Sequence, residues 1–406
     1  MKGNKGYVLE KGFLGLVNGD YELFSDENEH DEYLKNIREN HKLPQSYQEN
    51  YNAITTGLLK LFIKEKGNEN IVFSPFSILT LLGMAASATA GEACNEILSV
   101  IFEGAELQTA LLNLKKVSGH FLKSGSLSSA NAVCIQPELH STIRPEYEGA
   151  LTRDFDGRLF MTNDMVQDVN KWVSQATNGM INEVLDESNE NVLACLLNAI
   201  AFDADWKFPY KDDDIYDGEF TSASGVVREC KMLNSEEDWY IENETIKGFV
   251  KLYKDKEYCF MALLPKDRSK GAFSDVIEGL NLSEIYDSAE RETVYVTLPE
   301  YRYAFEEDLT SILIKKGISK VFTIQAAFSP MTTSKLKVDS ILHKVFIDVS
   351  RKGTRAAAVT ECVVVAGGCP DFKTVTLDRP FIYAIIHQAT ALPVFCGIVN
   401  DIAEEQ

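Results

Sequence analysis

The chain has 406 residues, of which 45% are hydrophobic, and its formal net charge is −21 at pH 7. This apolar content is ordinary for a globular protein, and no Pro-, Gly- or Ser-rich linker divides the chain. The acidity excludes nucleic acids and anionic membranes as expected partners, because phosphate binding requires clustered Lys and Arg. It favours long-range attraction of a basic protein instead.

Residues 1–45 are expected to form an acidic extension, and residues 46–406 a single domain. Acidic side chains are dense between Asp20 and Glu32, which is typical of a solvated tail. Residues 1–20 contain no continuous apolar segment, so no signal peptide is visible. We expect an extracellular protein if the chain is a mature or trimmed form and a cytoplasmic one otherwise. The compartment therefore stays open.

The chain contains 8 cysteines, and they form neither a CxxC motif nor a cluster with His. No metal site and no cofactor are therefore expected. Most of these cysteines lie in apolar segments, where a free thiol behaves as a small core side chain. Reduced thiols are favoured, although the spacing does not exclude disulfides.

The first predicted elements are a helix over Tyr47–Lys66 and a short strand from Asn70 that Pro75 ends. A helix rich in small residues over Leu79–Thr89 follows. Later segments predict strands near 130–136, 192–204, 249–253, 259–264, 293–299 and 344–349, and helices near 144–152, 166–179, 309–317 and 334–340. Because regular βαβ alternation is absent, this order indicates an α+β fold with mainly antiparallel sheets.

Residues 354–366 separate into two faces when they are read at the strand period of two. One face carries only small or apolar side chains, and the other carries the charges of Arg355 and Glu361. Gly353 precedes this segment, and Gly367-Gly368 follows it with the composition of a loop. From these residues alone, an ordinary buried strand and a mobile segment that inserts into a sheet are equally open.

Motifs from residue 51 to residue 401 resemble those of the serpin family and occur in the same order. They are Asn70–Ile78, Gly83–Gly91, Asn131-Ala132, Val169–Ile181, Leu197–Trp206, His343-Lys344, Asp378–Phe381 and Pro393–Gly397. The resemblance implies three mainly antiparallel β-sheets, eight or nine helices and an exposed reactive loop at about 351–373. It also implies a metastable native state whose cleaved loop enters the main sheet as an added strand.

The same resemblance assigns site residues to three places. The hinge of the loop corresponds to Gly353, Thr354, Arg355, Ala356, Ala357 and Ala358. A polar cluster beneath the opening of the main sheet, the shutter, corresponds to Ser74, Ser77, Asn198 and His343. The top of this sheet, the breach where insertion begins, corresponds to Trp206, Glu300 and Arg351. Core packing and a satisfied buried histidine are the alternative roles of Trp206 and His343.

The breach departs from the family pattern at two positions. The residue two before the hinge glycine is usually Glu and here is Arg351, and the often basic third residue of the LP-x motif here is Glu300. Because both signs are reversed together, we predict an Arg351–Glu300 ion pair. Arg355 also replaces the usual Glu, but it lies on the outward face.

The scissile bond in this family usually follows the residue fourteen positions after the hinge glycine, which predicts Gly367–Gly368. Val365 and Ala366 are neighbouring candidates. These small residues suit an elastase-type pocket, whereas trypsin-like enzymes need a basic residue and chymotrypsin-like enzymes an aromatic one. The resemblance thus predicts a suicide-substrate inhibitor that is a monomer and forms a covalent complex with an elastase-like serine protease.

Two other classes of function compete with this one. A non-inhibitory serpin that acts as carrier, chaperone or storage protein is the alternative, and the uncharged hinge favours inhibition over it. A hydrolase is not expected, because the chain contains no G-x-S-x-G or other recognisable nucleophile motif. The protein is therefore not expected to be an enzyme.

Overall fold

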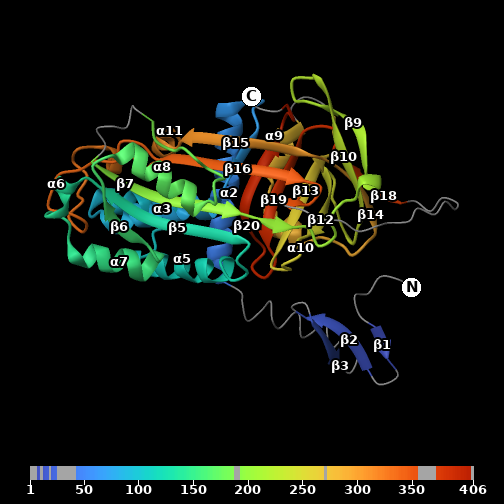
Figure 1. Cartoon of the computed structure of the whole chain (residues 1–406), viewed down its shortest axis with the longest axis horizontal. Helices are drawn as coiled ribbons and strands as arrows, with labels where there is room; N and C mark the ends of the chain where they lie inside the picture. The colour runs from blue at the N-terminus through green and yellow to red at the C-terminus, as the bar shows by residue number, and fades with distance from the viewer. Residues whose placement is uncertain are drawn as a thin grey trace. The chain divides into compact units, whose positions relative to one another are not determined.

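The computed structural model describes residues 7–9, 12–17, 20–24, 43–186, 193–268, 272–354 and 372–403. The chain forms two compact units, each assembled from three stretches of sequence. We call residues 49–203, 301–349 and 394–406 the helical unit, and residues 1–48, 204–300 and 350–393 the sheet unit. Figure 1 shows the fold coloured along the chain.

The helical unit holds most of the helices. Its helices are α2 (Gln45–Lys66), α3 (Pro75–Ala88), α4 (Glu92–Ile101), α5 (Leu107–Phe121), α6 (Pro137–His140), α7 (Pro145–Phe155), α8 (Met165–Ala176), α11 (Thr310–Lys315) and the 3₁₀ turn η3 (Lys320–Phe322). Its strands are β4 (Ile71–Phe73), β5 (Leu127–Ile135), β6 (Arg158–Met161), β7 (Ala194–Phe202), β15 (Tyr301–Asp308), β16 (Leu342–Ser350) and most of β20 (Leu392–Val399). β5 pairs antiparallel with β7 and parallel with β6, and β15 pairs antiparallel with β16.

Helix α3 illustrates how local sequence sets these elements. Ser74 is its N-cap, and the Ser74 hydroxyl accepts a hydrogen bond from the Ser77 backbone N–H at 3.2 Å. Pro75 occupies the first helical position, where a missing N–H costs nothing. The helix therefore begins at Pro75, four residues earlier than the apolar period alone predicts.

Helix α8 packs on β5 and β7 (Figure 1). Its apolar face presents Val169, Trp172 and Val173 at helical spacing to alternate side chains of the two strands, including Cys134 and Leu197. This cluster of buried side chains is the core that holds β7 in place.

The sheet unit is dominated by antiparallel strands. They are β8 (Ala204–Asp205), β9 (Ile215–Thr221), β10 (Val227–Glu237), β11 (Trp239–Glu242), β12 (Ile246–Leu252), β13 (Tyr258–Pro265), β14 (Val294–Pro299), β17 (Gly353–Thr354), β18 (Lys373–Thr376) and β19 (Phe381–His387). The strands pair in the orders β18-β14-β10-β9 and β11-β12-β13-β19, with β14–β18 as a parallel pair. The 3₁₀ turn η2 (Asp212–Asp214) and the helices α9 (Ala272–Glu278) and α10 (Leu282–Asp287) complete the unit.

The acidic extension contains backbone order that its composition did not predict. β1 (Tyr7–Leu9), β2 (Gly12–Val17) and β3 (Asp20–Phe24) form an antiparallel sheet of three strands. The signal lies in the sequence: Asn18-Gly19 separates β2 from β3, and this dipeptide is the strongest short hairpin signal. The division into an extension over 1–45 and one domain over 46–406 stays a prediction.

The predicted strands and most predicted helices agree with the structure, but the helix over 334–340 is wrong. These residues follow an irregular path, and the Val338 N–H donates to the Val321 carbonyl at 3.0 Å. A segment this short cannot repay helix nucleation without tertiary packing. Among the described residues, ten α-helices are present, several of them short, and no helix is long and apolar enough to cross a membrane.

Candidate functional site

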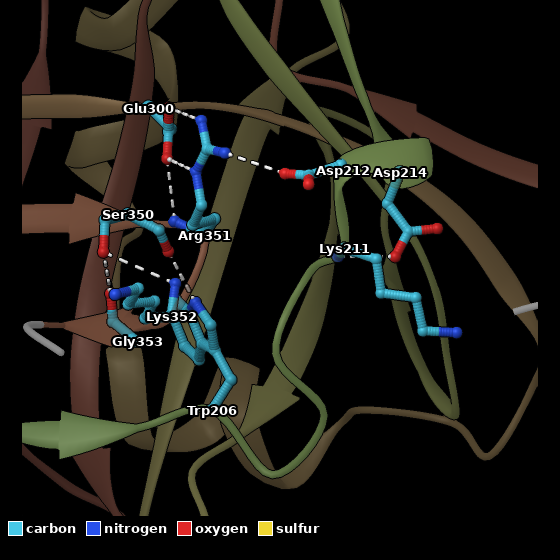
Figure 2. A network of polar contacts seen from close by, with 9 residues as sticks. All are labelled: Trp206, Lys211, Asp212, Asp214, Glu300, Ser350, Arg351, Lys352 and Gly353. Carbon is cyan, nitrogen blue, oxygen red and sulfur yellow. Dashed lines mark hydrogen bonds and ion pairs between the residues drawn. The ribbon is translucent and has the colours of Figure 1, made fainter. Parts of the chain in front are cut away.

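Residues 350–352, which precede the predicted reactive loop, are held by backbone and indole hydrogen bonds in the sheet unit. The Trp206 indole Nε1–H donates to the Ser350 carbonyl at 2.9 Å, and the Trp206 backbone N–H donates to the Lys352 carbonyl at 3.0 Å (Figure 2). The Tyr210 N–H donates to the Arg351 carbonyl at 2.8 Å. Three consecutive carbonyls before the predicted hinge are therefore fixed by Trp206 and Tyr210.

The first two residues of the predicted hinge form β17, which pairs antiparallel with β8. Gly353 lies opposite Asp205, and Thr354 lies opposite Ala204. A Cβ atom on Gly353 would lie 2.2 Å from the Ala204 carbonyl oxygen, so only glycine fits this close approach. Close packing against β8, rather than backbone freedom alone, is thus the physical requirement for glycine here.

Thr354 is buried, with 4% of its surface exposed, and its hydroxyl lies 2.7 Å from the Tyr253 hydroxyl. The family resemblance implies that Thr354 is the first side chain to enter the sheet during insertion. In the structure the Thr354 side chain is already buried in the uncleaved protein. An uncharged residue with one hydrogen-bonding group meets the demands of such a position.

The predicted Arg351–Glu300 ion pair is present. The Arg351 Nε lies 3.2 Å from Glu300 Oε1, and the Arg351 backbone N–H donates to the same oxygen at 2.9 Å (Figure 2). Hydrogen bonding to Glu300 raises the pKa of the Arg351 guanidinium. A second carboxylate, Asp212 of η2, lies 3.3 Å from Arg351 NH1 but is 98% exposed. Glu300 is therefore the principal partner.

A buried cation lies under the same segment. The Lys251 ammonium lies 2.6 Å from Glu237 Oε1 and 4.4 Å from the Tyr210 ring centroid, and only 2% of its side chain is exposed. Burial alone lowers the pKa of Lys251, but the Glu237 carboxylate and the Tyr210 phenol outweigh burial and raise it. Lys251 also lies over the Trp206 ring at 5.4 Å, so it supports the indole that binds Ser350.

In the helical unit, three of the four predicted shutter residues share hydrogen bonds. The Ser74 backbone N–H donates to His343 Nε2 at 3.2 Å, while the Ser74 hydroxyl accepts from the Ser77 backbone N–H. His343 is buried, and burial lowers the pKa of its imidazole to about 3. An imidazole that accepts from a backbone N–H is neutral at that nitrogen, in agreement with its burial.

Asn198, the fourth predicted shutter residue, bonds elsewhere. Its amide donates to Asn131 Oδ1 at 2.7 Å and to the Ser129 hydroxyl at 3.2 Å, across the β5–β7 pair. The Asn131 amide in turn donates to the Phe155 carbonyl at 2.8 Å. Asn198 thus links β7 to β5, and Asn131 links β5 to the end of α7.

Comparison with known proteins identifies the family. Residues 49–402 match the profile of the family described as Serpin (serine protease inhibitor). The chain belongs to the serpin family. Family membership supports protease inhibition as its general activity, and serpins are generally not enzymes.

Similar proteins come from distant organisms. The serpin is 27% identical to plasminogen activator inhibitor 1 of Bos taurus, over 84% of this chain and 88% of the relative. It is 27% identical to an uncharacterized serpin-like protein of Thermococcus kodakarensis, over 85% and 84% of the two chains. The native state of tengpin, a thermophilic serpin, has a similar structure with a TM-score of 0.81 and 29% identity, covering 89% of this chain and 95% of tengpin.

The distal hinge and the predicted scissile bond lie outside the described residues. These positions are Arg355, Ala356, Ala357, Ala358, Val365, Ala366, Gly367 and Gly368. Of the hinge, only Gly353 and Thr354 are therefore placed. Their assignment as hinge, and the roles of the shutter and breach residues, stay predictions.

The structure adds three residues that the sequence did not single out: Tyr210, Lys251 and Tyr253. The sequence contains a clue to Lys251, because a single charged residue in the otherwise apolar segment 248–252 indicates a buried charge that needs a partner. No signal in the sequence marks Tyr210 or Tyr253, because a buried tyrosine is ordinary in a protein core.

No metal site emerges from the ranges that the structure describes, since they contain no group of three or more His, Cys, Asp or Glu side chains placed to hold an ion. The described cysteines are free thiols, and burial raises the pKa of Cys134 and of Cys195 to about 12. A raised pKa disfavours the thiolate, so these two thiols are poor nucleophiles.

Proposed function

We propose that this serpin is a suicide-substrate inhibitor of serine proteases with a preference for elastase-like enzymes. The proposal rests chiefly on one observation: Gly353 and Thr354, the first residues of the predicted hinge, pair with β8, and the uncharged Thr354 side chain is buried there. The uncharged alternate positions that follow in the sequence would extend the same pairing. A charge at any of them would enter the sheet without a partner.

The proposed reaction begins as ordinary proteolysis. The protease serine Oγ attacks the Gly367 carbonyl carbon, an ester forms, and the amide bond to Gly368 breaks with release of a new amino terminus. The freed loop then extends the β17 pairing into the main sheet and carries the acylated protease with it. Deacylation by water stops because the protease active site is distorted.

The preference for elastase-like enzymes rests on side-chain size. The residues around the proposed bond, Val365, Ala366 and Gly367, are small, and no basic residue lies between Arg355 and Lys373. A shallow apolar pocket accepts such residues, whereas a pocket built around a carboxylate needs a cation.

Incubation with an elastase-like and a trypsin-like protease tests the proposal. We expect a denaturant-resistant complex with the elastase-like enzyme, seen on denaturing gels, and a released peptide that begins at or within two residues of Gly368, seen by mass spectrometry. Gly367→Arg should add activity against trypsin-like enzymes while leaving the hinge unchanged.

Three outcomes would contradict this proposal. The proposed scissile bond is wrong if cleavage occurs beyond Cys369. It is also wrong if the unaltered protein preferentially inhibits the trypsin-like enzyme. A non-inhibitory carrier, chaperone or storage protein would form no complex, and its melting temperature would be equal before and after nicking in the loop. An inhibitor should melt higher after nicking, because insertion adds backbone hydrogen bonds and buries apolar side chains.

A further inference from the structure

A basic pocket lies within the sheet unit, away from the hinge contacts described above. Its volume is about 410 Å³, and it lies among β12, the residues after β13 and the end of β18. Among its described lining residues, four are cations and one is an acid: Lys247, Lys266, Arg268, Arg379 and Asp378. Such a concentration of positive charge is unexpected in a chain with a net charge of −21.

The two guanidiniums are positioned by the single carboxylate of this lining. Asp378 Oδ1 lies 2.9 Å from Arg379 NH1, and Asp378 Oδ2 lies 3.3 Å from Arg268 NH2. The Arg379 guanidinium also donates to the Pro265 carbonyl at 2.6 Å, and its side chain is 14% exposed. One carboxylate thus orders two cations but neutralises only one charge.

The lysines add to this excess. Lys247 on β12 donates to the Thr374 carbonyl at 2.9 Å, a neutral partner, and both burial and the nearby Arg379 charge lower its pKa. Lys266 is paired with Glu242 at 2.8 Å, and the Glu242 carboxylate also binds Lys373 at 3.2 Å. Asp267 intervenes in the sequence but does not line the pocket. The lining therefore retains more positive than negative charge.

We propose that this pocket binds a small, multiply charged oxyanion of the phosphate or sulfate class. Arg268 and Arg379 present fork-shaped donors that match tetrahedral oxyanions, and Lys247 supplies a partly desolvated ammonium. The Thr376 hydroxyl, on the exposed end of β18, is a further donor at the rim. The ligand is a phosphorylated small molecule or a sulfated saccharide, which share this chemistry.

Binding would join three segments that meet at the pocket. Lys247 belongs to β12, Arg268 follows β13, and Thr376 and Arg379 belong to or follow β18. A ligand that binds only the folded state raises the melting temperature by mass action. Saturable binding and stabilisation should therefore appear together.

Calorimetric titration of the intact protein tests the proposal with inorganic tripolyphosphate in one arm and sucrose octasulfate in the other. Sodium chloride at matched ionic strength is the control for nonspecific screening. We expect one saturable site and a rise in melting temperature with at least one probe. Binding of only tripolyphosphate indicates a phosphorylated ligand, and binding of only the octasulfate indicates a sulfated one.

Matched variants locate the site. Lys247→Gln and Arg268→Gln each keep a donor but remove a charge, and each should weaken binding about tenfold, since charge-assisted hydrogen bonds are the strong ones. Lys231→Gln is the control, because Lys231 is an exposed lysine paired with Asp217 outside the pocket. Thr376→Glu, at an exposed position, should abolish binding without a burial cost.

The proposal fails if neither probe binds saturably or if both stabilise the protein no more than sodium chloride does. It also fails if Lys247→Gln, Arg268→Gln and Thr376→Glu bind as tightly as Lys231→Gln. Should a glutamine variant fold poorly, Thr376→Glu alone decides the location. Retention of protease inhibition by these variants would separate this site from the proposed function of the loop.

Discussion

The hydroxyl of Thr354 lies 2.7 Å from the hydroxyl of Tyr253, and both residues are buried. Tyr253 also stacks on Trp206, with ring centroids 4.6 Å apart and planes inclined by 9°. The Trp206 indole in turn holds the Ser350 carbonyl. Thr354 and Ser350 are therefore both held by one pair of stacked aromatic side chains, Tyr253 and Trp206.

This arrangement predicts the effect of changing Thr354. Thr354→Arg would bring a charge without a partner to a buried position, so it should destabilise the native protein by several kcal/mol and convert an inhibitor into a substrate. Thr354→Val should cost about 1 kcal/mol, because it removes the hydrogen bond between the Thr354 and Tyr253 hydroxyls, yet it should keep complex formation. Thr354→Ser retains the hydroxyl and is the control.

The two readouts for this series are the melting temperature and the yield of covalent complex with an elastase-like protease. A full complex yield from Thr354→Arg would show that burial at this position does not govern insertion.

The Arg351–Glu300 pair should contribute modestly to stability. Both side chains are partly exposed, at 37% and 24%, so a double-mutant cycle of Arg351→Gln and Glu300→Gln should give a coupling free energy of about 1 kcal/mol or less. The coupling should shrink as salt is added, because screening acts on exposed charges. Chemical denaturation at low and high salt measures it.

Asp212→Asn is the matched control for this pair, since the Asp212 side chain is 98% exposed although it lies 3.3 Å from the same guanidinium. Its effect should be close to zero. A larger loss from Asp212→Asn than from Glu300→Gln would reverse the assignment of the principal partner.

The sequence predicts the Arg351–Glu300 pair but not the side chains that surround it. Glu300 and Arg351 are 51 residues apart, and their pairing followed from two charge reversals against one family pattern. By contrast, the contacts of Thr354 with Tyr253 and of Lys251 with Glu237 depend on strand register and side-chain direction, which no local pattern encodes. The same limit explains Asn198, whose motif placed it with His343 while its amide reaches across to β5.

For the secondary structure as well, the sequence predicts the elements with strong local patterns and misses those that depend on tertiary contacts. Helix α2 and the core strands have long apolar periods, so the sequence predicts them closely. The wrong helix over 334–340 and the unpredicted strands β2 and β3 are short segments, where a turn signal or a single tertiary contact outweighs periodicity.

Burial of His343 predicts a pH dependence of stability. The unfolded chain takes up a proton near pH 6.5, whereas the folded imidazole remains neutral down to about pH 3. Between these values the unfolded state binds more protons, so the free energy of unfolding falls as the pH falls, by about 1.4 kcal/mol per pH unit well below 6.5. Above pH 7 this contribution is constant.

His343→Gln should remove that part of the slope, because glutamine still accepts from the Ser74 N–H but does not titrate. Chemical denaturation of both proteins at pH 5, 6 and 7 measures the difference. Parallel curves for the two proteins over this range would show that His343 does not stay neutral in the folded state.

The last prediction concerns the buried Lys251–Glu237 pair. Lys251→Met should cost about 3–5 kcal/mol, because it leaves the Glu237 carboxylate, only 11% exposed, without its cation. Lys251→Met combined with Glu237→Gln should recover part of that loss, since no charge then remains buried. Lys254→Met is the control: this lysine is 75% exposed and 3.8 Å from Asp205, and its replacement should change stability by less than about 0.5 kcal/mol. Denaturant titration of the four proteins gives the comparison. If Lys251→Met lost no more stability than Lys254→Met, the buried pair would not stabilise the folded protein.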